Sequence, residues 1–175
     1  MSQGKKFDHV SFRIYSEVMT TLDREAERLR VSVNSLVNQV LSNYTAFNRI
    51  VEHMQAVPLN RALFTQMLEA IEISAMERIG RELGPKIVKQ TFKFLNLDYD
   101  VDNLIKHYFQ PVSMHSRWYV FNVAGSGSNR RLMFEHPYGP KWSVFLKGYL
   151  GGIIKSITGS DPRITVEDGL VTAFC

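Results

Sequence analysis

The strongest constraint on the fold is a strand pattern near the start of the chain that has no partner strand close to it in sequence. Polar and apolar residues alternate strictly over His9–Ile14, which places Val10, Phe12 and Ile14 on one face of a strand. A single strand has two unpaired edges, and a segment of about 45 residues buries too little surface for a stable monomer. We therefore expect this strand to pair, antiparallel, with the same strand of a second chain.

Two amphipathic helices are predicted directly after this strand. Ser16 is an expected N-cap, and an apolar stripe with helical spacing follows it as far as Leu29. The pattern breaks at Arg30, and Ser32 is a second expected N-cap before another apolar stripe that ends at Tyr44. This order predicts, in the dimer, a two-stranded ribbon backed by four helices. The polar face of such a ribbon fits the major groove of B-DNA.

The segment from His9 to Tyr44 resembles the ribbon-helix-helix family of DNA-binding proteins, whose β-ribbon readers include MetJ and Arc. The resemblance rests on the alternating strand, the helix entry at residues 16–18 and the turn at residues 31–32. It implies that outward strand residues contact base edges and that the start of the second helix holds a phosphate through backbone amides. With two nearby lysines, the expected DNA-binding residues are Lys5, Lys6, His9, Ser11, Arg13, Ser32, Val33 and Asn34.

One position departs from the family pattern. A left-handed residue, usually glycine, ends the first helix in that family, and this chain has Arg30 there. A non-glycine residue in this conformation costs on the order of 1 kcal/mol. The alternative interpretation is an ordinary strand followed by two helices within a larger α/β core.

The centre of the chain is predicted to be helical. The helical spacing continues beyond Tyr44 and indicates a linker over residues 46–58. Residues 59–84 are the next predicted helix, and Pro85 opens another because proline suits the first helical turn. A further helix is expected over residues 98–109, ending before Pro111.

The last third of the chain predicts two strand hairpins separated by one helix. Aromatic and branched residues over 118–123 and 131–136 form the first hairpin, and residues 140–158 form the helix. Residues 164–174 form the second hairpin, across the Asp168-Gly169 turn. We expect small residues of the helix to allow close approach of another backbone: Gly148, Gly151 and Gly152.

Residues 59–175 resemble the sensor domains of the 4-vinyl reductase type, distant relatives of the haem-nitric-oxide-binding domains. The most specific part of the resemblance is residues 142–166. It implies an enclosed apolar pocket for a ligand, for which we expect the lining residues Phe134, His136, Trp142, Phe145 and Tyr149. Many members carry cysteines in the closing hairpin, whereas this chain has only Cys175. A metal site of that kind is therefore not expected.

The composition of the chain limits the cellular compartment, the membrane association and the metal sites that can be expected. A single cysteine excludes a disulfide within one chain and indicates a cytoplasmic setting. No run of about 18 apolar residues exists, and the basic N-terminus precedes no hydrophobic stretch, so neither a membrane span nor a secretory signal is expected. The five histidines lack metal-ligand spacing. An interior haem would need His107, His115 or His136 as its axial ligand. The sequence does not determine whether the chain binds a cofactor.

The expected fold class is α+β, with a ribbon-helix-helix domain over residues 1–45 and an α/β sensor-like domain with an antiparallel sheet over residues 59–175. The formal charge of +4 permits nucleic-acid binding, and no catalytic constellation indicates an enzyme. We expect a homodimeric, sequence-specific transcriptional regulator that binds double-stranded DNA and a small apolar effector. The sequence leaves open whether dimers form higher oligomers on DNA. The alternative is a C-terminal protein-interaction module without a small-molecule ligand.

Overall fold

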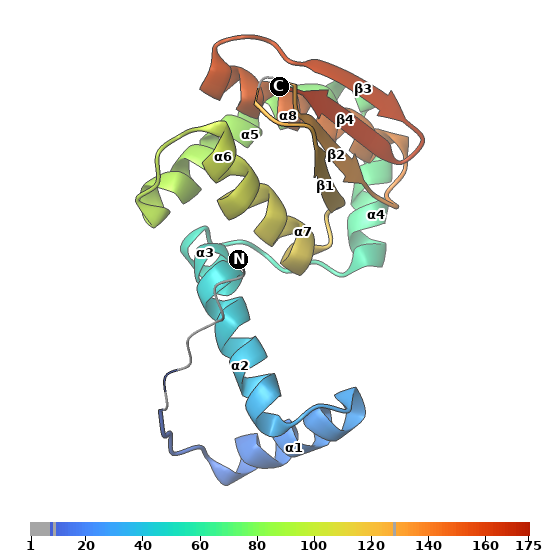
Figure 1. The fold of residues 1–175 in the computed structure, drawn as a ribbon. Helices are drawn as coiled ribbons and strands as arrows, with labels where there is room; N and C mark the ends of the chain where they lie inside the picture. Colours follow the sequence, from blue (N-terminus) through green and yellow to red (C-terminus); the bar gives the residue numbers. More distant parts are fainter. Residues whose placement is uncertain (1–7, 9, 128) are drawn as a thin grey trace. The chain divides into compact units, whose positions relative to one another are not determined.

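The computed structural model describes residues 8, 10–127 and 129–175, and the chain divides into two compact units (Figure 1). The first unit is Met1–Tyr44 and the second is Thr45–Cys175. Helices and a four-stranded antiparallel sheet make the chain an α+β protein, in agreement with the expected class. The segment expected to be a linker, residues 46–58, lies within the second unit.

Helix α1 spans Ser16–Leu29 and ends at a left-handed residue. Arg30 has φ 56° and ψ 43°, and the amide of Val31 donates back to the last turn of the helix at 3.0 Å. This is the Schellman arrangement, here with arginine where glycine would fit at lower cost. The N-cap expected at Ser16 is wrong by one residue, because extended Tyr15 precedes the helix and no side chain caps it.

Helix α2 spans Val33–Asn43 and begins with the second expected cap. The Oγ of Ser32 accepts a hydrogen bond from the backbone amide of Ser35 at 3.1 Å, which confirms the predicted N-cap. Among the described residues of the first unit, only Ala26 and Leu36 are buried. The helix pair therefore has a very small core of its own.

The strand expected over His9–Ile14 is not confirmed. Residues 10–15 form no strand with any other part of the described chain, and His9, Lys5 and Lys6 lie outside the described residues. A strand whose partner belongs to a second chain has no ladder to form within one chain. The ribbon-helix-helix assignment stays a prediction.

The helices of the remaining chain run, in order, η1 (π-helical, Tyr44–Asn48), α3 (Arg49–His53), α4 (Arg61–Ala70), α5 (Ile73–Leu95), α6 (Val101–Leu104), η2 (π-helical, Ile105–Phe109), α7 (Gln110–Ser116) and α8 (Pro140–Thr158). Two predicted breaks are wrong, because α5 runs through Pro85 and α7 contains Pro111. The break in the central helices lies instead at Ile71 and Glu72. No helix in the described part of the chain combines the length and apolar character needed to cross a bilayer.

The sheet has the order β1-β2-β4-β3, and its neighbouring strands are antiparallel (Figure 1). Its strands are β1 (Val120–Ala124), β2 (Arg131–Glu135), β3 (Arg163–Glu167) and β4 (Leu170–Phe174). Both predicted hairpins are confirmed. On the central strands, Leu132 lies opposite Ala173 and Phe134 opposite Val171, and all four side chains are buried. These residues form the sheet side of the core.

Helix α8 crosses α5 at backbone contact distance. A Cβ at Gly148 would lie 2.1 Å from the carbonyl oxygen of Glu77, and one at Gly152 would lie 2.4 Å from that of Arg81. The expected close approach is thus confirmed at these two glycines. At Gly151 a Cβ would meet only side chains, the nearest at 3.6 Å, so this glycine does not take part in the crossing.

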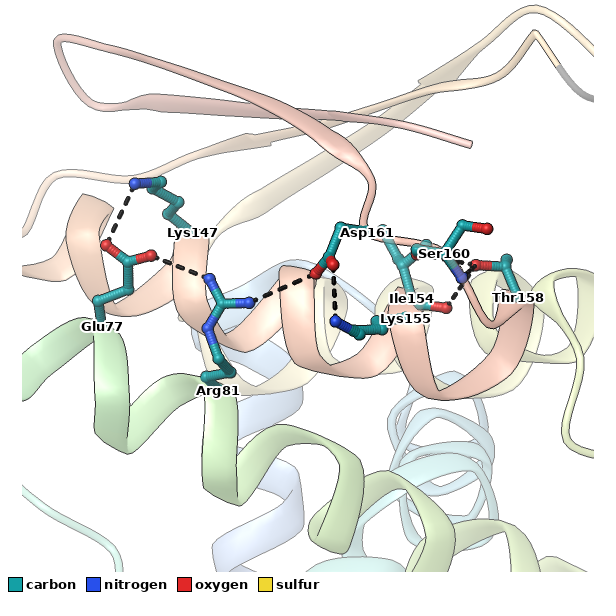
Figure 2. Close-up of polar contacts among 8 residues, drawn as sticks. All are labelled: Glu77, Arg81, Lys147, Ile154, Lys155, Thr158, Ser160 and Asp161. Carbon is teal, nitrogen blue, oxygen red and sulfur yellow. Dashed lines mark hydrogen bonds and ion pairs between the residues drawn. The ribbon is translucent and has the colours of Figure 1, made fainter.

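A chain of ion pairs runs along the exposed edge of the same crossing (Figure 2). Glu77 contacts Lys147 at 3.1 Å and Arg81 at 3.0 Å, and Asp161 contacts Arg81 at 3.6 Å and Lys155 at 2.6 Å. Partial burial tends to raise the pKa of Glu77, but its hydrogen bonds with Lys147 and Arg81 hold that pKa below its ordinary value. Such exposed pairs stabilise weakly, so the glycine contacts set the helix separation.

Candidate DNA interface and candidate ligand groove

The segment before α1 presents apolar side chains that nothing in the described chain covers. Val10, Phe12 and Ile14 are 62%, 64% and 42% exposed. Ser11 and Arg13, which alternate with them, are also exposed. Exposed apolar side chains gathered in one short segment mark an interaction surface. The strand pattern would bring Val10, Phe12 and Ile14 to one face and the two polar residues to the other.

The beginning of α2 offers backbone donors to an anion. Helix geometry supplies no acceptor for the amides of Val33 and Asn34 in the first turn. The side chain of Ser32 accepts from Ser35 and so occupies a different amide. The positive end of the helix dipole lies at the same place. Three of the predicted DNA-binding residues are thereby brought together in one turn.

The second unit contains a groove with a volume of about 1080 Å³. Its lining residues come from η1 and α3, from α5 and α7, and from the segment that leads into β1, among other parts of the unit. The apolar side chains that line these parts of the groove include Phe47, Ile50, Val51, Ile87, Val112 and Trp118. Apolar grooves of this size, with few polar groups, are typical of small-molecule sites.

Two tyrosines that line the groove belong to a cluster of buried hydroxyls. The hydroxyls of Tyr108 and Tyr149 share a short hydrogen bond, whereas the hydroxyl of Tyr119 has no hydrogen-bond partner within the described chain. Tyr119 is only 2% exposed. Burial raises the pKa of Tyr108 to about 12, against the effect of its bond with Tyr149. Burial, and secondarily the nearby Tyr108, raise the pKa of Tyr119 well above its ordinary value.

The five residues predicted to line a pocket are buried in the core, and none of them lines this groove. Four of them contact lining residues, and Phe145 contacts Trp142 and Tyr149 instead. Phe134 meets the Tyr119 ring edge-on at 4.8 Å, and Trp142 meets the Trp118 ring at 5.5 Å. The remaining predicted members are Phe145, which stacks on Trp142 at 4.5 Å, together with Tyr149 and His136. The predicted pocket residues are thus core residues of the second unit, whereas Trp118 and Tyr119, predicted to lie in a strand, line the groove.

Two of the histidines considered as haem ligands, His136 and His115, have other contacts. Nε2 of His136 shares a hydrogen bond with Oγ of Ser143 at 3.0 Å, and its Nδ1 accepts from the amide of Tyr138 at 3.3 Å. Burial lowers the pKa of His136. His115 stacks on Phe47 with ring centroids 5.3 Å apart. Residues 8, 10–127 and 129–175 contain no group of three or more His, Cys, Asp or Glu side chains placed to hold a metal ion.

Replacing Tyr119 by phenylalanine should stabilise the second unit by about 1 kcal/mol, because a buried hydroxyl without a partner costs about 1 to 3 kcal/mol. Replacing Tyr149 by phenylalanine should destabilise it by a similar amount, since the Tyr108 hydroxyl then loses its partner. Urea unfolding followed by tryptophan fluorescence measures both, because both tryptophans, Trp118 and Trp142, lie in this unit. Equal loss of stability in the two variants would show that the Tyr119 hydroxyl has a partner.

No protein-family model matches this chain, and no curated protein is similar enough to count as a relative. The candidate interface and the candidate groove therefore rest on the residues and their geometry.

Proposed function

We propose that this chain is a homodimeric transcriptional regulator that binds specific DNA sequences through its first unit and a small effector through its second. The observation that carries the proposal is the exposed apolar set of Val10, Phe12 and Ile14, next to a helix pair with almost no core. Residues 1–45 act as the ribbon-helix-helix DNA-binding part in this proposal.

Dimerisation would cover the apolar side chains that are exposed in the first unit. Leu29, Val40 and Leu41 on the two helices are 44%, 51% and 47% exposed, in addition to the apolar residues before α1. Each large apolar side chain contributes about 1.5 to 3 kcal/mol when it becomes fully buried. A second copy with the same alternating strand supplies both the missing ladder and the missing cover.

DNA recognition follows from what the paired ribbon would leave outside. The polar face carries Ser11 and Arg13, and an arginine can donate two hydrogen bonds to the edge of a guanine. The free amides at Val33 and Asn34 suit a phosphate on each side of the ribbon. The net charge of +4 favours approach to a polyanion.

Effector control follows from the position of the groove. The wall residues Phe47, Ile50 and Val51 belong to η1 and α3, which directly follow α2 along the chain. A ligand that binds one arrangement of this wall better than another shifts the population toward it. The DNA affinity then changes by the same coupling free energy.

The test is selection of duplexes from a random library, followed by affinity measurements with an Arg13→Ala variant. The wild type should enrich one sequence. The variant should bind that sequence about 5 to 150 times more weakly, because a bidentate contact contributes about 1 to 3 kcal/mol of discrimination. It should also lose the preference for this sequence over random DNA.

A matched control removes the same charge elsewhere in the unit. Arg24 is exposed and belongs to α1 rather than to the predicted strand, so Arg24→Ala should keep the sequence preference. The proposal is wrong if the wild type enriches no sequence, or if the two alanine variants lose affinity equally.

A further inference from the structure

We infer that the groove of the second unit binds an uncharged, mostly apolar small molecule whose hydrogen-bond acceptor reaches the hydroxyl of Tyr119. The inference rests on the proposed effector-binding role of this unit, and it adds the site and the chemical class of the ligand. No residue in it belongs to the candidate DNA interface.

The hydroxyl of Tyr119, whose oxygen is buried, differs from the other hydroxyl groups of the residues that line the groove. Four lining side chains donate to or accept from nearby backbone groups: Thr91, Ser113, Ser116 and Tyr138. Tyr108 bonds to the hydroxyl of Tyr149. In the described part of the chain, Tyr119 is the buried side chain left with an unpartnered polar atom. Buried polar groups are almost always hydrogen-bonded in native structures, so this one indicates a missing partner.

The missing partner should accept a hydrogen bond. Burial keeps the pKa of Tyr119 well above its ordinary value, so the phenol stays protonated and carries a proton to donate. The phenol of Tyr108 is held protonated in the same way. A ligand carbonyl or ether oxygen satisfies Tyr119 without introducing a further donor among these hydroxyls.

The ligand should be uncharged because the charged side chains that line the groove are exposed to solvent. Arg61, Arg117 and Glu135 are the charged lining residues, and all three are exposed. The ring of the buried Phe134 packs against Tyr119, and the apolar Val112 and aromatic Trp118 line the same groove. An ionised group would lose its hydration there without gaining an ion-pair partner.

The test uses two fluorescent naphthalenes that differ at one group, with the full-length chain. The first probe, 6-propionyl-2-(dimethylamino)naphthalene, has a ketone, and the second, 6-propyl-2-(dimethylamino)naphthalene, has none. The ketone probe should bind the wild type, and Tyr119→Phe should weaken its binding about tenfold. The ketone-free probe should bind both proteins equally. Tyr99→Phe is the control, because the Tyr99 hydroxyl bonds to Ser156 and Tyr99 does not line the groove.

Several outcomes separate this inference from the proposed function. Absence of ketone-probe binding to the wild type, or equal changes for both probes in Tyr119→Phe, overturns the site. If this occurs while the wild type still selects a DNA sequence, the DNA-binding proposal survives alone. Selective weakening of the ketone probe supports the site, even where the same preparation selects no DNA sequence and the regulator proposal fails.

Discussion

An alanine at position 148 is expected to destabilise the second unit by about 3 kcal/mol, although it adds a single methyl group. The new Cβ would lie 2.1 Å from the carbonyl oxygen of Glu77, and a backbone atom cannot rotate away as a side chain can. The helices α5 and α8 would have to separate, and their other close contacts would open with them. A loss of this size is a large part of the stability of an ordinary domain. Urea unfolding followed by tryptophan fluorescence measures it.

Gly151→Ala is the matched control on the same helix. Its Cβ would meet the Cδ1 of Ile164 at 3.6 Å, an ordinary contact distance, and no backbone atom. Alanine is about 1 kcal/mol better than glycine inside a helix, so this variant should be neutral or slightly more stable. Equal unfolding midpoints for the alanine variants at positions 148 and 151 would refute the backbone contact between α5 and α8.

Replacing Phe12 by aspartate is expected to convert the proposed dimer into a monomer and to abolish the proposed sequence-specific DNA binding. Phe12 lies at the centre of the apolar set that the second copy would cover. A carboxylate buried there without a partner costs several kcal/mol in each chain. Sedimentation analysis should give the 20.1 kDa of one chain instead of twice this mass. The second unit should unfold as in the wild type, because Phe12 is not part of it.

Ser11→Asp places the same charge one residue away, on the opposite face of the proposed ribbon. This variant should remain a dimer and lose DNA binding, since the new carboxylate faces the phosphates and base edges. A Phe12→Asp chain that still sediments as a dimer would contradict the ribbon. Loss of the dimer in both variants would show that the two positions do not lie on opposite faces.

Local sequence signals predicted the structure of this chain best where that structure depends on neighbouring residues. The turn at Asp168-Gly169 joins two strands as predicted, with Gly169 at φ 68°. Ser32 caps α2, and Arg30 has the left-handed conformation that ends α1. Caps and tight turns are made by hydrogen bonds and backbone angles within a few residues. Their signals are therefore complete in a short stretch of sequence.

The two prolines show where local signals failed. Pro85 lacks the amide that would bond the carbonyl of Arg81, yet α5 continues because it packs along α8. The same carbonyl lies against Gly152, which has no side chain to clash with it. Pro111 follows the π-helical η2 and stands in the first turn of α7, where no amide donor is required. Neither compensation is visible in the residues next to the proline.

The residues of this chain by themselves determined its α+β class, its hairpins, the α8 helix and the two-helix turn of the first unit. The tertiary structure alone decided that Gly80 and Gly84 of α5 lie against the backbone of α8 at Phe145 and Tyr149. It also decided that Tyr119 and Trp118 line a groove while Trp142 and Phe145 are buried in the core. Local patterns identify which side chains avoid water. Which of them face each other, and which are left facing a ligand, depends on packing between segments far apart in sequence.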